Sequence, residues 1–152
     1  MKQLILTIMA SIALFIAVPA AHAADDAKWF ALSSTNGETT SINTDIKAAD
    51  NGQAYLVWVR YSYDEPAARD YYTKLNEFSQ TIYYKVILYK FTEDWNKFNI
   101  VQAAYYGAGG KVIYEYTNPD MPSTESVVPA GAPIDNICNA AQVIYKDRNN
   151  LD

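Results

Sequence analysis

Residues 83–117 read YYKVILYKFTEDWNKFNIVQAAYYGAGGKVIYEYT, and this stretch decides the fold. Three runs rich in tyrosine, valine and isoleucine, at 83–92, 97–106 and 111–117, are typical of β-strands. The loops between them are too short for a crossover connection, so successive strands are expected to pair antiparallel. The stretch therefore predicts a β-meander.

The preceding residues add further strand signals. Short strands are predicted at 28–33 and 39–43, and the longest at 53–63, which reads QAYLVWVRYSY. This longest run is apolar on both faces at its start, which favours a central strand covered on one side by a helix. Between the strands, we expect Thr44-Asp45 to cap a single helical turn and Asp50-Asn51-Gly52 to form a tight turn.

Two segments repeat apolar residues at helical spacing. In 66–79, Pro66 suits a first helical position; a partial helix is favoured there, and a mobile insertion is the alternative. A C-terminal helix is expected from Pro133, with one apolar stripe formed by Ile134, Ile137, Cys138, Ala141, Ile144 and Tyr145. Residues 118–133 hold four of the six prolines and are expected to be a loop or strap, and residues 149–152 to fray.

These elements predict an α+β fold in one domain spanning 24–152. The expected architecture is an antiparallel sheet of about six strands in meander order, with the C-terminal helix packed on one face. A domain of this size can bury a core without disulfides.

The first 23 residues have the features of a secretory signal peptide. Lys2 precedes an apolar run from Leu4 to Val18, and Ala21-His22-Ala23 forms a small-x-small cleavage site. The apolar run is shorter than the roughly 20 residues of a spanning helix. The mature protein is therefore expected to be exported without a membrane span, to the periplasm, the outer surface or the medium.

Cleavage would leave a chain of 129 residues with unusual composition. His22 is the only histidine and would be removed, while Cys138 is the only cysteine. Ser-His and Cys-His nucleophile pairs, histidine zinc sites and internal disulfides are then excluded, and no cofactor or enzyme activity is expected. Without Lys2 the net charge becomes −6, with no basic cluster, which argues against nucleic acid as a partner.

Motifs that suggest other chemistry have simpler interpretations. Gly107 to Lys111 resembles a phosphate-binding loop, but Tyr105 and Val112 occupy the positions of its first glycine and its Ser/Thr, so a hairpin turn is favoured. The carboxylate pairs Asp64-Glu65 and Glu93-Asp94 lie in predicted loops and are expected to be solvated.

Four residues are candidates for an interaction site. The chain holds 13 tyrosines and 3 tryptophans, all after the signal peptide. Trp95, Tyr105 and Tyr106 lie near predicted hairpin ends and are candidate anchors for a protein partner; packing on their own sheet is the alternative. Cys138 is expected to be either a buried small hydrophobe or the thiol of an intermolecular disulfide.

The chain resembles the surface-adhesin protein E domain of secreted Gram-negative proteins. The resemblance runs from Trp29 to about Tyr145. It rests on KWFALSS, VWVRYSY, YKVILYKFTED, the AAYYGAGGKVIYEY hairpin, the VVP tripeptide ending at Pro129 and the closing helix. It implies an antiparallel sheet with a packed C-terminal helix, exposure at the outer surface or in the periplasm, adhesion to host extracellular-matrix and plasma proteins, and dimer formation.

The chain departs from the pattern of that family in its cysteines. Members of the family carry one cysteine after the aromatic strand and a second in the last helix, an arrangement that implies a disulfide. This chain has Glu93 or a close neighbour at the first position and no second cysteine. Packing of Ile134, Ile137, Ala141 and Ile144 would then hold the helix, contributing on the order of 5 to 10 kcal/mol before entropy.

Two functions remain open at this level. The first is adhesin-like binding of a protein partner through the aromatic sheet and loop surface. The alternative is a periplasmic domain that maintains the envelope or inhibits another protein, with no host contact. Both are non-enzymatic.

Overall fold

A computed structural model of the protein describes residues 28–117 and 125–149. Residues 1–27, which include the predicted signal peptide, residues 118–124 of the proline-rich loop and residues 150–152 lie outside these ranges. Within the described ranges, no helix is both long and apolar enough to cross a membrane.

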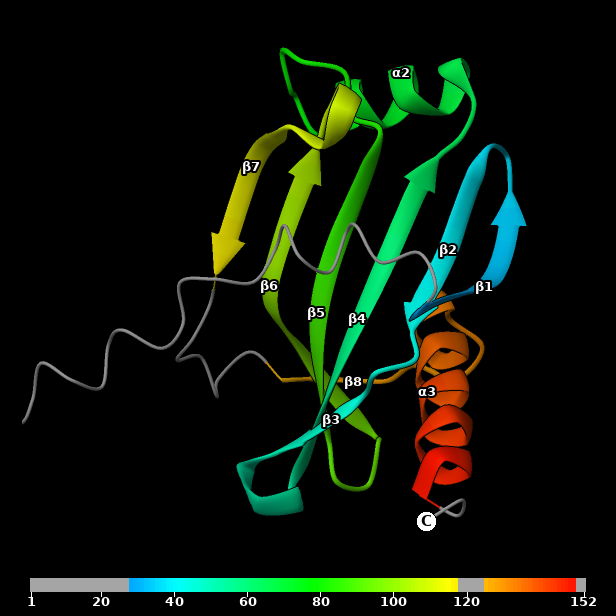
Figure 1. Cartoon of the computed structure of the whole chain (residues 1–152), viewed down its shortest axis with the longest axis vertical. Coiled ribbons are helices and arrows are strands. Elements are labelled where there is room, and N and C mark those ends of the chain that lie inside the picture. Colours follow the sequence, from blue (N-terminus) through cyan, green and yellow to red (C-terminus); the bar gives the residue numbers. More distant parts are fainter. Residues whose placement is uncertain (1–27, 118–124, 150–152) are drawn as a thin grey trace, which may run out of the picture.

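The described strands form one antiparallel sheet in meander order (Figure 1). Six strands follow the path β1 (Trp29–Thr35), β2 (Glu38–Asn43), β4 (Ala54–Tyr63), β5 (Tyr84–Thr92), β6 (Lys97–Tyr106) and β7 (Val112–Thr117). Two short strands join from the side: β3 (Lys47–Ala49) pairs with β4, and β8 (Ser126–Val127) pairs with β6. The predicted α+β class and meander are confirmed.

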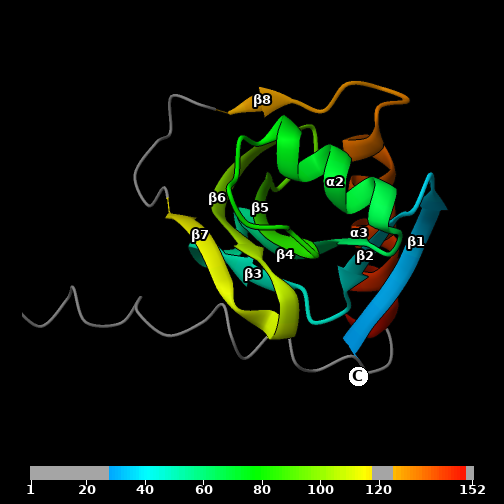
Figure 2. The same cartoon turned by 90° about the horizontal axis from the view of Figure 1, so that it is seen from above.

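The two described α-helices, α2 and α3, lie on the same face of the sheet, the helical face. Helix α3 (Pro133–Asn149) buries Ile137, Cys138 and Ala141 in the larger core cluster, as its apolar stripe predicted. Helix α2 (Pro66–Leu75) buries Ala68 in a smaller cluster with Tyr63 and Ile82. Seen from above, the sheet curves around α2, and α3 stands beside β1 and β2 (Figure 2).

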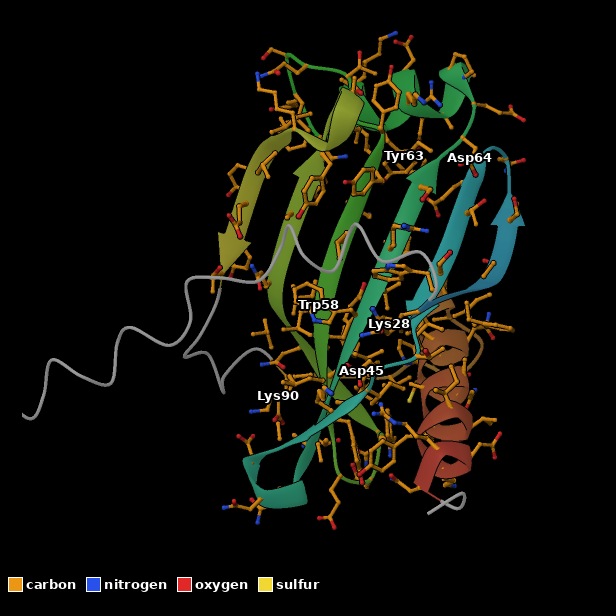
Figure 3. The ribbon with its side chains drawn as sticks, viewed as in Figure 1. Lys28, Asp45, Trp58, Tyr63, Asp64 and Lys90 are labelled. Carbon is orange, nitrogen blue, oxygen red and sulfur yellow. The ribbon has the colours of Figure 1, made fainter. Side chains whose placement is uncertain are left out.

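The register of the central strands places side chains in rows across the sheet. Tyr61 of β4 pairs with Lys85 of β5, and Lys85 pairs with Tyr105 of β6. Because side chains alternate between faces, these three lie on the helical face together with Tyr63. Trp58 (Figure 3) belongs to the opposite face, where it packs with a third cluster of Val86, Ala104 and Tyr106.

The link between β2 and β4 differs from the expectation. The single helical turn predicted at Thr44-Asp45 is wrong, and the short strand β3 follows instead. Ile46 is 4% exposed and belongs to the cluster under α3. An extended backbone delivers this side chain to the core while Lys47–Ala49 pair with β4, which a helical turn would prevent.

Candidate binding surface

Trp95 is held by contacts within its own domain. It lies in the β5–β6 turn, half-buried, with its ring stacked on Tyr55 at a centroid distance of 4.3 Å and an interplanar angle of 10°. Its ring also lies 5.5 Å from that of Phe91, in the cluster under α3. Most of its apolar surface is therefore committed to packing the turn against the core.

The turn that carries Trp95 is shaped by Asp94. The Asp94 carboxylate accepts hydrogen bonds from the Thr92 hydroxyl at 2.7 Å and the Asn96 backbone N–H at 3.3 Å. The Thr92 bond is the main cause that lowers the pKa of Asp94. The turn places Trp95 at a φ of 60°, a left-handed conformation that is uncommon for a residue with a side chain.

Cys138 contacts this turn from α3. Its thiol is 2% exposed and donates to the Trp95 carbonyl oxygen over 3.2 Å. Burial is the main cause that raises the pKa of the thiol, which disfavours the reactive thiolate. Cys138 is a free, buried side chain in this chain, and a disulfide to another molecule would require α3 to move away from the turn.

Tyr105 and Tyr106 point to opposite faces of the sheet. Tyr106 is 1% exposed and stacks on Tyr84 at 4.5 Å, on the face away from the helices. Tyr105 is half-buried on the helical face, where its ring meets that of Phe78 edge-on at 5.0 Å. The three aromatic candidates of the sequence, Trp95 included, are therefore not gathered into one site.

Tyr105 instead lies among a group of aromatic residues from α2, the segment after it, β6 and β7 that we call the aromatic surface. Phe78 and Tyr105 both contact Tyr114 of β7, at 6.0 and 6.3 Å. Towards α2, Tyr105 packs on the same cluster as Tyr72, whose ring meets that of Tyr71 edge-on at 5.0 Å. The aromatic surface consists of Tyr71, Tyr72, Phe78, Tyr105, Tyr114 and Tyr116.

Several of these rings are open to solvent. Tyr71 is 60% exposed, Tyr114 50% and Tyr116 40%. Sequence reasoning missed Tyr114 and Tyr116 as candidates, although the alternation in KVIYEYT places both on one face of the last meander strand. The sequence also could not show that the 66–79 segment folds back so that Phe78 contacts Tyr114.

Helix α2 is fixed to the sheet by specific contacts at both ends. At its start, Arg69 donates from Nε to the Tyr63 carbonyl at 2.8 Å, and its guanidinium lies 4.2 Å from the centroid of the Tyr83 ring. After its end, the Tyr105 hydroxyl donates to Asn76 Oδ1 over 3.4 Å. The predicted partial helix is thus confirmed, and it presents its tyrosines from an anchored support.

The tyrosine hydroxyls of this region are neutral donors. Burial is the main cause that raises the pKa of Tyr72 to about 12, and the Glu38 carboxylate adds to the effect. Burial also raises the pKa of Tyr105. These phenols therefore stay protonated at neutral pH and offer O–H donors beside apolar rings.

Two open depressions lie elsewhere on the described surface. One, of about 600 Å³, is formed by the β5–β6 turn. The other, of about 610 Å³, lies beside the end of α3 and is lined by Lys28, Thr44, Asp45, Lys47, Ile144, Asp147 and Arg148. Among residues 28–117 and 125–149, no group of three or more histidine, cysteine, aspartate or glutamate side chains is placed to hold a metal ion.

Asp45 ties the end of α3 to the β2–β3 link. Its Oδ1 atom accepts from Arg148 Nη1 at 2.6 Å and from Lys47 Nζ at 2.7 Å (Asp45 is labelled in Figure 3). The hydrogen bond from Lys47, followed by that from Arg148, lowers the pKa of Asp45 from 3.8 to about 2. The depression beside α3 is thus bordered by ion pairs that join the β2–β3 link to the end of α3.

The Asp45 contribution to stability should disappear in acid. Since its pKa is lower in the folded than in the unfolded chain, the contribution is complete above the unfolded value of 3.8 and is lost as the pH falls through about 2. We expect the difference in unfolding free energy between the wild type and Asp45→Asn to shrink across that window, measured by urea unfolding. A difference for Asp45→Asn that stays constant with pH would contradict this assignment.

Comparison of the chain with protein-family models, with curated proteins and with solved structures finds no match. The resemblance to the surface-adhesin protein E domain therefore remains an expectation from the quoted motifs.

Proposed function

We propose that the protein is an exported, non-enzymatic binding protein that engages a protein partner through the aromatic surface beside α2. In the adhesin-like form of this proposal, the partner is a host extracellular-matrix or plasma protein. The second candidate function is a periplasmic domain that maintains the envelope or inhibits another protein. The aromatic surface serves either function equally, and only the location of the partner differs.

The exposed aromatic rings of this surface carry the proposal. Tyr71 and Tyr114 leave half or more of their surface in water, and the rings of Phe78 and Tyr105 both contact that of Tyr114. Aromatic residues are enriched in protein interfaces because one ring buries a large apolar area and still offers a hydroxyl. Tyrosine also loses little side-chain entropy when a partner covers it.

The scaffold under these rings favours binding to a protein. Tyr114 and Tyr116 project from a paired strand, and Tyr71 and Tyr72 from a helix anchored at both ends. A surface already held in one conformation needs little ordering when the partner binds, so more of the contact energy appears as affinity.

A paired set of double variants tests the aromatic surface. Tyr71→Ser with Tyr114→Ser removes exposed rings from it, and Phe30→Ser with Val143→Ser removes exposed apolar side chains elsewhere, 59% and 58% exposed. Binding of each protein would be measured against a panel of purified matrix, plasma and envelope proteins. We expect Tyr71→Ser with Tyr114→Ser to weaken binding to the panel protein that the wild type captures by about tenfold or more, as loss of aromatic hot spots does. Equal affinity of both variants would contradict the proposal.

The location of the protein separates the two candidate functions. Protease added to intact cells should digest an adhesin exposed at the outer surface but spare a periplasmic protein. Digestion supports the adhesin form, and protection supports the envelope form.

A further inference from the structure

Lys85 lies on the helical face in a row that neither described helix fully covers. The cross-strand row consists of Thr40, Tyr61, Lys85, Tyr105 and Tyr114. Tyr61 packs against both the cluster under α3 and the cluster under α2, so it marks the boundary between the two covered areas. Tyr61, Lys85 and Tyr105 are each only half-buried. We call these three residues, with Tyr63 and Tyr89, the inter-helix strip.

The ammonium group of Lys85 has no anionic or hydrogen-bonding partner in the described structure. Its Nζ atom lies 4.6 Å from the centroid of the Tyr61 ring, a cation–π contact. Burial lowers the pKa of Lys85, and the charge of Glu38 only partly opposes this, with no ion pair formed between the two among the described residues. A cation that is partly removed from water without a hydrogen-bond acceptor is unfavourable, so an anion at this point would be bound favourably.

The Tyr61 ring that contacts Lys85 carries a hydroxyl paired with a second phenol. The Tyr61 and Tyr89 oxygens lie 3.0 Å apart, and since one hydroxyl donates to the other, one O–H proton of the pair is left over. Among the described residues, the Tyr63 hydroxyl has no hydrogen-bond partner although its residue is 1% exposed (Tyr63 is labelled in Figure 3). Burial, followed by the charge of Glu38, raises the pKa of Tyr63, so this hydroxyl keeps its proton. Unpaired buried donors are rare in folded proteins and call for an explanation.

We propose that the inter-helix strip binds a carboxylate group, with one oxygen on Lys85 Nζ and the other on the left-over O–H of the Tyr61–Tyr89 pair. The inference rests on the proposed function in one respect: the carboxylate is supplied by the protein partner that covers the adjacent aromatic surface. Tyr105 belongs to both the strip and the aromatic surface, so one ligand segment can cover both.

The charge balance favours a carboxylate over a more highly charged anion. Lys85 supplies one positive charge, and the nearby Glu38 carboxylate repels a doubly charged anion more strongly than a singly charged one. A carboxylate carries a single charge on two oxygens and accepts from ammonium and hydroxyl donors at once. An acidic side chain and a free C-terminus share this chemistry, so both are sources to be distinguished.

Three short peptides can serve as probes in the absence of the partner. The first is acetyl-Gly-Glu-Gly-amide, with a side-chain carboxylate; the second is acetyl-Gly-Gly-Gly, with a free C-terminus; the third is the neutral acetyl-Gly-Gln-Gly-amide. Each would be titrated into the isotope-labelled protein, following the side-chain NMR signals of Tyr61, Lys85 and Tyr105. We expect saturable shifts at these three residues with one or both carboxylate peptides, and about tenfold or more weaker binding of the neutral peptide. The peptide that binds identifies the source.

Two lysine variants of the same strand complete the experiment. Lys85→Met keeps the length of the side chain and removes its charge, and it should abolish the saturable shifts at Tyr61 and Tyr105. Lys90→Met is the matched control, because Lys90 lies on the opposite face and pairs with Asp50. It should leave the titration unchanged.

The inference is overturned if no peptide gives saturable shifts at the strip, if the neutral peptide binds as well as the acidic ones, or if Lys85→Met binds like the wild type. The first result is expected of a lysine that only extends its ammonium to water. If the peptides bind the wild type but the Tyr71→Ser/Tyr114→Ser protein binds the partner as tightly as the Phe30→Ser/Val143→Ser control, the proposed function alone is rejected. If the Tyr71→Ser/Tyr114→Ser protein loses partner binding but no peptide binds the wild type, this inference alone is rejected.

Discussion

Ile137→Ala should lower the free energy of unfolding by roughly 2–5 kcal/mol, because it leaves a cavity in the largest core cluster. Ile137 is 1% exposed and lies on the stripe that joins α3 to the sheet. With Cys138 as a free thiol, no disulfide among the described residues supplements this packing. Chemical denaturation followed by circular dichroism would measure the effect.

Val143→Ala is the matched control on the same helix. Val143 is 58% exposed, so its truncation should change the free energy of unfolding by only about 0.5 kcal/mol or less. If Ile137→Ala were as mild as this control, α3 would not be held to the sheet by its apolar stripe.

Trp95→Ala should lower the free energy of unfolding by about 2–4 kcal/mol, because it removes an aromatic ring packed against the core. The loss is smaller than for a fully buried tryptophan because this ring is only half-buried. The variant loses the stack on Tyr55 and the contact with Phe91. Trp95→Phe, which keeps an aromatic ring at the same place, should recover most of the loss. The measurement is urea unfolding of the three proteins under one set of conditions.

The same variant separates the structural role of Trp95 from the binding role predicted for it. At a temperature where the variant is fully folded, we expect Trp95→Ala to bind the captured partner as tightly as the wild type. Unchanged stability together with lost binding would instead make Trp95 an interface residue.

The sequence predicts the sheet because its signals are local. The tyrosine- and valine-rich runs with short polar turns fix antiparallel neighbours, and the stripe from Ile134 to Tyr145 fixes the buried side of α3. The sequence did not predict strand β3. Its three residues are held extended by pairing with β4 and by burial of the preceding Ile46. Tertiary contacts of this kind leave little trace in a short sequence window.

The candidate site depends on contacts that are distant in sequence. Tyr105 and Tyr106 looked equivalent as neighbours, yet alternation along β6 buries Tyr106 and directs Tyr105 to the helical face. The contact of Phe78 with Tyr114 requires the segment between α2 and β5 to meet β7 at the same end of the sheet. Lys85 likewise becomes a candidate binding residue only because the strand register places it between Tyr61 and Tyr105. The composition of the sequence does not reveal this register.

Site-specific photo-crosslinking tests the central claim most directly, because it reports which surface the partner covers. A photoreactive phenylalanine analogue would replace Tyr114 in one variant and Phe30, an even more exposed ring on the opposite edge strand β1, in another. With the partner identified from the panel, the account predicts a crosslink to that partner from position 114 and none from position 30. A crosslink from position 30 with none from position 114 would contradict it.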